Sequence, residues 1–181
     1  MRVIAGHYGG RQLAAPPGLD LRPSSDALRE TLFNILGPGI QEAVFVDACA
    51  GTGAVGIEAL SRGAAEVVFF EIARAALAVL HRNLARLGQP PAARVLRRAV
   101  PAGFALLARP ADLVFLDPPY AAAEVYERCL TALGAASAPL RAGGRVIAEH
   151  ARRRNLAASY GSLRRVRVVA QGDSQLSFYT A

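Results

Sequence analysis

The segment from Val44 to Arg62 constrains the fold of this chain more than any other part of it. It consists of a short apolar stretch, VFVDA, a glycine-rich turn, CAGTG, and a segment, AVGIEALSR, that we interpret as a helix. A strand, a tight turn and a helix in this order begin a βαβ unit, and consecutive units of this kind build a parallel sheet. The segment therefore predicts an α/β fold.

The same alternation of strands and helices continues along the chain. The next expected helix has Leu77, Leu80, Leu84 and Leu87 in phase on one face. The expected strands are nearly uninterrupted apolar runs, which are typical of a parallel sheet with helices on both of its faces. The further strands are EVVFFE, RVLRR, DLVFLD and GRVIAEH, and the further helices are PAGFALLAR and EVYERCLTAL.

The end of the chain departs from this alternation. LRRVRVVA and QLSFYT flank a Gly-Asp-Ser turn, which predicts an antiparallel hairpin at one edge of the sheet. Before this hairpin, the run Arg152-Arg153-Arg154 is expected to begin a helix with a solvated, charged surface that could also touch a nucleic acid. We therefore expect residues 41–181 to form one α/β domain that closes with a hairpin.

Residues 1–40 are expected to form an N-terminal extension. RVIAGHYGGRQL, residues 2–13, predicts a β-hairpin around Gly9-Gly10, and the Pro/Gly-rich passage after it cannot be helical. From Ser24, the expected N-cap, a helix is predicted that ends at Gly37-Pro38-Gly39. The residues expected on its buried face are Leu28, Leu32, Ile35 and Leu36.

The charge of the chain favours anionic partners. The formal net charge is +7, and all 21 basic residues are arginines. Such an excess suits nucleic acid or an acidic membrane surface. The apolar residues form no run of the ~18 residues that a membrane span needs. No signal peptide is recognisable, and two cysteines, Cys49 and Cys129, are too few for a disulfide scaffold, so we expect a cytoplasmic protein.

The glycine-rich turn predicts a cofactor site. Its glycines allow the backbone to approach a ligand closely, and they also fit the G-x-G-x-x-G pattern of dinucleotide-binding proteins. Asp47, at the end of the first strand, would repel a pyrophosphate but attract the amino group of S-adenosylmethionine. Glu71, at the end of the second strand, can accept hydrogen bonds from ribose hydroxyls in either cofactor class. We therefore expect S-adenosylmethionine, and no clustered Cys/His spacing predicts a metal.

A second motif, DPPY at residues 117–120, follows the strand DLVFLD and so lies at the carboxyl edge of the sheet, where open α/β folds bind ligands. An amino group attached to a base is a poor nucleophile, because its lone pair is delocalised into the ring. The carboxylate of Asp117 and the carbonyl of Pro118 can accept its hydrogen bonds, and Tyr120 can stack on the base. The motif predicts methyl transfer to an exocyclic amino group.

A third motif, RPSSDALRETLFNIL at residues 22–36, lies in the N-terminal extension. Together with IAGHYGGRQL, DACAGTGAVGIEALSRGA and DPPY, it resembles the bacterial family that methylates guanine N2 in 16S ribosomal RNA, and the resemblance covers essentially the whole chain. It implies a Rossmann-like, S-adenosylmethionine-dependent methyltransferase with a mostly parallel seven-stranded sheet. It also implies 16S rRNA as the partner, within the small ribosomal subunit or an assembly intermediate.

The motifs and the resemblance together assign candidate residues to three roles. Relatives usually meet the cofactor's adenine with an acidic or amide residue before an alanine. This chain has Arg98-Ala99-Val100 there, so backbone groups and apolar packing are expected instead. The cofactor candidates are Asp47, Ala48, Cys49, Ala50, Gly51, Thr52, Gly53, Glu71 and Ile72; the catalytic candidates are Asp117, Pro118, Pro119 and Tyr120; and the candidate RNA contacts near the active-site mouth are Arg2, His7, Arg11, Arg22 and Arg29.

Three alternatives stay open. DPPY serves an adenine N6 amino group in DNA or RNA equally well, because the motif specifies an amino group rather than a base. The glycine pattern also suits a nicotinamide-dependent oxidoreductase. Finally, a non-catalytic RNA-binding assembly factor would keep the fold without the reaction.

Overall fold

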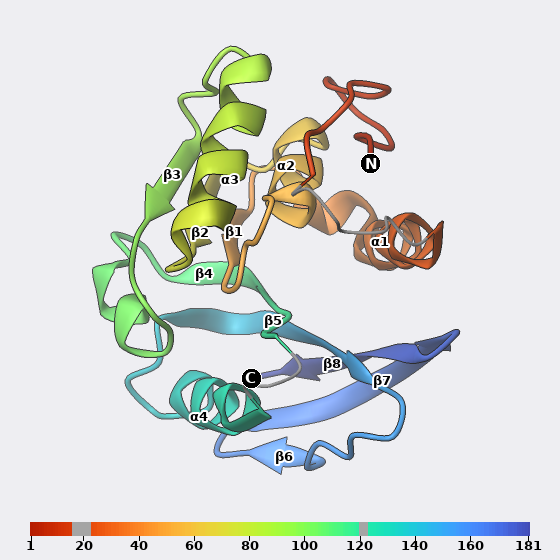
Figure 1. The fold of residues 1–181 in the computed structure, drawn as a ribbon. Helices are drawn as coiled ribbons and strands as arrows, with labels where there is room; N and C mark the ends of the chain where they lie inside the picture. The colour runs from red at the N-terminus through yellow and green to blue at the C-terminus, as the bar shows by residue number, and fades with distance from the viewer. Residues whose placement is uncertain (16–22, 120–122) are drawn as a thin grey trace.

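A twisted sheet forms the centre of the computed structural model, which describes residues 1–15, 23–119 and 123–181 (Figure 1). Within these residues the sheet has eight strands in the order β3-β2-β1-β4-β5-β8-β7-β6. The first five are parallel, and the last three pairings are antiparallel. The strands are β1 (Val44–Asp47), β2 (Glu66–Phe70), β3 (Ala93–Leu96), β4 (Ala111–Leu116), β5 (Leu140–Ala151), β6 (Ser159–Tyr160), β7 (Leu163–Gln171) and β8 (Ser174–Thr180).

The mostly parallel sheet and the C-terminal hairpin of β7 and β8 confirm the predicted architecture, with one difference. The sequence predicts seven strands, and the eighth, β6, pairs with the start of β7 outside the hairpin. Two residues are too few to show an alternating pattern, which is why β6 escapes prediction. The hairpin therefore does not form the outermost edge along its whole length.

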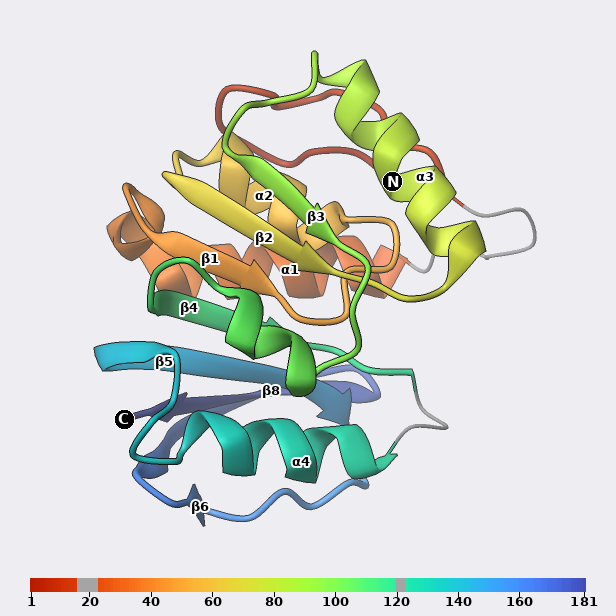
Figure 2. The same cartoon turned by 90° about the vertical axis from the view of Figure 1, so that its left-hand side faces the viewer.

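Helices cover both faces of the sheet, as expected. Figure 2 shows α1, α2 and α3 on one face and α4 on the other. Phe33, Phe45 and Phe69 lie in the core under the first group, whereas Phe104 and Leu130 lie in the core of the opposite face. The α-helices are α1 (Pro23–Leu36), α2 (Ala54–Ser61), α3 (Arg74–Arg86) and α4 (Ala123–Leu133), and the 3₁₀ helices are η1 (Gly37–Ile40) and η2 (Ala102–Leu106).

Two expected helices are absent from the described residues. PAGFALLAR forms only the short η2, in which a Cβ on Gly103 would lie 2.8 Å from Phe70, so this segment is shaped by close packing rather than by helix propensity. The run beginning at Arg152 forms a turn, because β5 continues to Ala151, where it still pairs with Ser174 of β8.

The N-terminal segment, residues 1–15, folds back on itself without forming the expected strands. Its single bridge joins Arg2 to Gln12, and the Val3 N–H donates to the Arg11 carbonyl at 3.0 Å. The turn covers residues 7–10 and so includes the predicted Gly9-Gly10. Gly6 precedes it, and its φ of +82° and contact with the Ser61 carbonyl leave no room for a side chain. The Val3 and Leu13 N–H groups form bonds of a hairpin type, whereas the Ile4 and Ala5 N–H groups donate to the Glu58 carboxylate of α2.

Helix α1 begins two residues earlier than an N-cap at Ser24 predicts. Pro23 is its first residue, so Ser24 lies inside the first turn instead of capping the helix. Leu28, Leu32 and Leu36 are buried as expected, and Ile35 is half-buried. None of the described helices is long and apolar enough to cross a membrane.

Candidate cofactor and nucleic-acid site

Four carboxyl groups lie at the carboxyl ends of neighbouring parallel strands. Asp47 ends β1, Glu71 follows β2, Asp117 follows β4, and Glu149 stands near the end of β5. Among the residues that the structure describes, none of the four has an arginine or histidine within ion-pair distance. This edge therefore gathers acidic groups whose ionised forms a bound cation would stabilise.

Asp47 is the most buried of these groups, with 2% of its surface exposed. Its Oδ2 accepts a hydrogen bond from the Gly56 N–H at 2.9 Å, which ties the end of β1 to the first turn of α2. Burial raises the pKa of Asp47 to about 7; the Gly56 hydrogen bond opposes this rise, and the nearby charges of Asp117 and Glu71 add to it.

The glycine-rich turn has the backbone shape that its sequence predicts. Gly53, at φ +81°, is the N-cap of α2, and a Cβ there would lie 2.3 Å from Leu80 Cδ1. Gly51 has φ +54°, and a Cβ on it would meet no atom within 4 Å. Gly53 allows close packing between α2 and α3, and Gly51 leaves open space next to the backbone, where a ligand fits.

Glu71 fastens this turn from the neighbouring strand. Its Oε2 accepts a hydrogen bond from the Gly51 N–H at 2.8 Å, and its Oε1 accepts bonds from the Ile72 and Ala73 N–H groups at 2.7 and 2.8 Å. Ile72, the next residue, is 56% exposed. The candidate ribose-binding acid is therefore held rigidly beside an apolar surface.

The remaining cofactor candidates lie in the same turn. Ala48 and Ala50 are buried, and their N–H groups donate to the carbonyls of Phe115 and Phe70, both at 2.9 Å. Thr52 is half-buried, and its carbonyl accepts a hydrogen bond from Asn83 at 2.9 Å. Cys49 is half-buried, and burial raises the pKa of its thiol, so it is not poised as a nucleophile.

The Asp-Pro-Pro turn directly follows β4 at this edge. Asp117 and Pro119 are exposed, Pro118 is buried, and Tyr120 lies outside the described residues. Asp117 is open to solvent, yet the protein around it desolvates its carboxyl group enough to raise its pKa. An open, partly desolvated carboxyl group can accept a hydrogen bond from an entering amino group.

Sequence analysis missed Glu149 and Tyr126. The β4–β5 register places Leu116 opposite Ala148, so Glu149 comes next to Asp117 at the ends of adjacent strands. Desolvation, followed by the proximity of Asp117, raises the pKa of Glu149. The Tyr126 hydroxyl donates to the Glu149 carbonyl at 2.5 Å. The carboxyl-edge rule that selected Asp117 would have selected Glu149 too.

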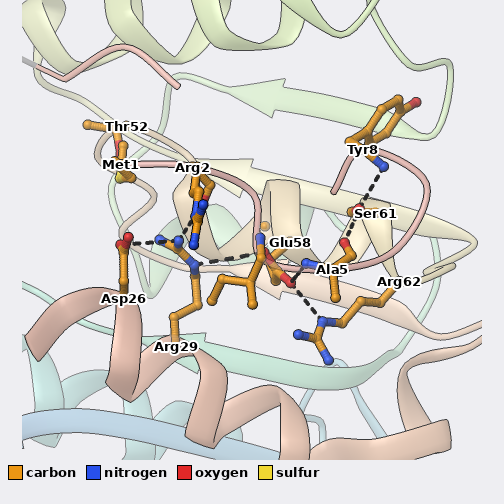
Figure 3. Close-up of polar contacts among 12 residues, drawn as sticks. Met1, Arg2, Ala5, Tyr8, Asp26, Arg29, Thr52, Glu58, Ser61 and Arg62 are labelled. Carbon is orange, nitrogen blue, oxygen red and sulfur yellow. Dashed lines mark hydrogen bonds and ion pairs between the residues drawn. The ribbon is translucent and has the colours of Figure 1, made fainter. Parts of the chain in front are cut away.

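Arg29, one of the expected RNA contacts, is buried instead of facing a ligand. Only 5% of it is exposed; its Nη2 donates to the Arg2 carbonyl at 2.6 Å and to Asp26 Oδ1 at 3.2 Å, and its Nε lies 3.9 Å from Glu58 Oε2 (Figure 3). A guanidinium enclosed by these groups is not available to a phosphate. Arg29 instead fastens the N-terminal segment to α1 and α2.

His7 and Arg11 are exposed, but they lie away from the expected active-site mouth. The His7 N–H donates to the carbonyl of Ser61 at 2.7 Å, and Arg11 Nη1 donates to the carbonyl of Arg86 at 3.2 Å. Ser61 and Arg86 are the last residues of α2 and α3, both of which begin at the carboxyl edge. Figure 2 shows the tip of the N-terminal segment at the end of the sheet opposite the arrowheads of β1 and β2.

Arg2 and Arg22 are the remaining expected RNA contacts. Arg2 is exposed and lies at the bridge to Gln12, and Arg22 lies outside the described residues. In the segment expected near the adenine of a cofactor, Arg98 and Ala99 are exposed, and Val100 packs against the core under α4.

Comparison with known proteins identifies the family of this chain. The family model of Conserved hypothetical protein 95 matches residues 1–180. Ribosomal RNA small subunit methyltransferase D of Escherichia coli is 43% identical over 120 residues, which cover 66% of this chain and 60% of that protein. The matched region thus spans less than two thirds of that relative's own length.

Two further relatives match nearly the whole chain. "Putative rRNA methyltransferase YlbH" of Bacillus subtilis is 34% identical over 182 residues, which cover 99% of this chain and 98% of that protein. The solved structure named "Putative methyltransferase yhhF", from Escherichia coli, superposes with a TM-score of 0.84 at 34% identity and covers 99% of this chain and 97% of its own. The fold is the Rossmann-like methyltransferase fold.

Proposed function

The chain belongs to the Conserved hypothetical protein 95 family, and from this membership and its site we propose that it transfers a methyl group from S-adenosylmethionine to N2 of a guanine in 16S ribosomal RNA. We further propose that the RNA is presented within the small ribosomal subunit or an assembly intermediate, in the cytoplasm. The names of the relatives support the substrate, and the carboxyl edge of the sheet supports the reaction.

The observation that carries the proposal is the group of acidic side chains beside the glycine-rich turn, which have no cationic partner among the described residues. S-adenosylmethionine, when bound, supplies an activated methyl group on a positively charged sulfur. Asp47 and Glu71 provide a cation-attracting surface, and the open space at Gly51 lets a ligand approach the backbone. The diphosphate of a dinucleotide would meet Asp47 and be repelled by its ionised carboxylate, which disfavours the oxidoreductase alternative. Glu71 suits the ribose of either cofactor and does not discriminate.

Asp117 and the carbonyl of Pro118 then act on the target base. The base has to leave its stack to reach the turn, as bases do in other nucleic-acid-modifying enzymes. The two acceptors hold the N–H groups of the exocyclic amine, so that its lone pair points towards the methyl group. Positioning and electrostatic complementarity supply most of the rate, and Asp117 need not remove a proton completely.

The test compares the wild-type protein with Asp117→Ala. In a calorimetric titration both proteins should bind S-adenosylmethionine with similar affinity and neither should bind NAD. With labelled cofactor and small subunits that lack the modification, we expect Asp117→Ala to lower methyl transfer by about 10²–10³-fold, the usual effect of removing one preorganised transition-state contact. Binding of NAD in place of S-adenosylmethionine, or unchanged transfer by Asp117→Ala, would overturn the proposal.

A further inference from the structure

Three consecutive arginines, Arg152 to Arg154, follow the end of β5. Arg152 and Arg153 are exposed and occupy a turn, and Arg154 is half-buried. In the described part of the chain no carboxylate lies within ion-pair distance of any of them. Two full positive charges therefore face solvent without compensation.

This arginine turn lies on the same edge of the sheet as the Asp-Pro-Pro turn. Strands β4 and β5 are adjacent and parallel, and Leu116 is opposite Ala148. Asp117 and Glu149 are the next residues of the two strands, and Arg152 follows three residues later, about 10 Å farther along at ~3.3 Å per residue. The arginines thus border the position where the base would react.

The turn is held in place by contacts on two sides. The Arg152 N–H donates to the Asp173 carbonyl in the β7–β8 turn at 2.9 Å, and the Arg154 N–H donates to the Ala151 carbonyl at 2.9 Å. The Arg154 guanidinium lies over the Tyr126 ring at 5.3 Å. Preorganisation of this kind lowers the entropic cost of binding a ligand.

The charges along this edge divide it into two kinds of surface. Asp47, Asp117 and Glu149 place acidic groups at its centre, which suit an amino group or a cationic cofactor and offer a phosphate no positive partner. A nucleic-acid backbone can approach only along a positive border. His7 and Arg11 lie near the opposite ends of the parallel strands, and Arg29 is buried. None of these three residues therefore supplies that positive border.

We propose that Arg152 and Arg153, held by Arg154, bind phosphates of the RNA strand that delivers the target base to Asp117. This inference rests on the proposed function for the identity of the RNA. Phosphate contacts fix the register of a protein on its nucleic acid without reading sequence, so the arginine turn would position the strand, whereas the choice of base would lie elsewhere.

The test is the salt dependence of binding to protein-free 16S rRNA, measured by filter binding without cofactor. The test variant is Arg152→Gln/Arg153→Gln, which spares the stacked Arg154. The control is Arg82→Gln/Arg86→Gln, which removes the same charge from two exposed positions on α3. We expect the slope of log K against log salt to become shallower by about 1.4 in the test variant, because each single-stranded phosphate contact contributes ~0.7.

The outcomes separate this inference from the proposed function. A shallower slope in the test variant and a wild-type slope in the control support the arginine turn, with a higher KM and unchanged kcat expected in methyl transfer. A wild-type slope in the test variant, or an equal loss in both variants, overturns it. If the wild type binds RNA but transfers no methyl group, the proposed function fails while the binding comparison still decides the arginine turn.

Discussion

Asn83 on α3 holds Thr52 in the glycine-rich turn: its Nδ2 donates to the Thr52 carbonyl at 2.9 Å. The same side chain accepts a hydrogen bond from the Ala14 N–H at 2.7 Å and donates to the Ala14 carbonyl at 3.1 Å. Asn83 is fully buried. One amide therefore joins the N-terminal segment to the turn that would bind the cofactor.

Replacing Asn83 should weaken cofactor binding as well as stability. Asn83→Ala leaves buried backbone groups unpaired, which costs about 1–3 kcal/mol in the free energy of unfolding. Loosening of the turn at Thr52 should also lower the affinity for S-adenosylmethionine, by roughly tenfold or ~1.4 kcal/mol. Urea denaturation and calorimetric titration measure the two effects.

Ser61→Ala is the matched control for this prediction. Ser61 is also buried and also holds the N-terminal segment, by accepting from the Tyr8 N–H at 2.9 Å and donating to the Ala5 carbonyl, but it does not contact the glycine-rich turn. It should lose stability and retain cofactor affinity. Equal cofactor affinity in both variants would show that Asn83 has only a structural role.

Gly53 should tolerate a side chain poorly for two reasons. Its φ of +81° costs an L-residue about 1–2 kcal/mol, and its Cβ would collide with the buried Leu80. Gly10 has the same φ of +81° but open space around it, so Gly10→Ala isolates the backbone cost. Thermal denaturation should show a larger loss of stability for Gly53→Ala than for Gly10→Ala. An equal loss of stability in both variants would contradict the packing contribution.

The buried charge of Glu58 should contribute strongly to the stability of the folded protein. It is fully buried, and its carboxylate accepts hydrogen bonds from Arg62 at 2.8 Å and from the Ile4 and Ala5 N–H groups at 2.7 and 3.1 Å, with Arg29 at 3.9 Å (Figure 3). Glu58→Gln leaves the buried Arg29 without one of its counter-charges. We expect it to lower the free energy of unfolding by about 3–5 kcal/mol.

Glu66→Gln provides the comparison for Glu58→Gln. Glu66 pairs with Arg94 at 3.3 Å and with Arg109 at 3.0 Å, both of which have well-exposed side chains. Pairs of this kind contribute up to ~1 kcal/mol. Urea denaturation should show a smaller loss in the free energy of unfolding for Glu66→Gln than for Glu58→Gln. Similar losses in the two variants would contradict the special role of the buried network around Glu58.

The raised pKa of Asp47 predicts how stability depends on pH. The folded state holds the Asp47 proton up to about pH 7, whereas the unfolded chain releases it near the usual value of 3.8. The folded state therefore binds more protons between these values, and the stabilising effect present below pH 3.8 is lost as the pH rises to about 7.

Asp47→Asn removes this proton linkage. In the absence of cofactor, its free energy of unfolding should decline less between pH 4 and pH 7 than that of the wild type, while its affinity for S-adenosylmethionine falls because the attracting charge is gone. Asp173→Asn, in the exposed β7–β8 turn, controls for the change in net charge. A decline as steep as in the wild type would contradict the raised pKa.

Local sequence patterns predicted those parts of the fold that depend on neighbouring residues. The in-phase leucines of α3 are buried, and the glycines at 51 and 53 adopt positive φ, because such features follow from periodicity and backbone sterics. The carboxyl-edge rule likewise brought Asp47, Glu71 and Asp117 together before strand order was known.

Features that depend on distant partners could not be predicted in this way. Arg29 has the same sequence signature whether it faces solvent or Glu58, and only the packing of α1 on α2 decides between them. The neighbourhood of Glu149 and Asp117 follows from the pairing of β4 with β5. The distance of His7 and Arg11 from the active edge follows from the direction in which the N-terminal segment crosses α2.

The most direct test of guanine-N2 methyl transfer is the identity of the methylated nucleoside. Small subunits that lack the modification are incubated with the protein and labelled S-adenosylmethionine, the 16S rRNA is digested, and the labelled nucleoside is identified by chromatography and mass spectrometry. We predict label in N2-methylguanosine with the wild type and its near absence with Asp117→Ala. Label in N6-methyladenosine, or none with the wild type, would contradict the proposed function.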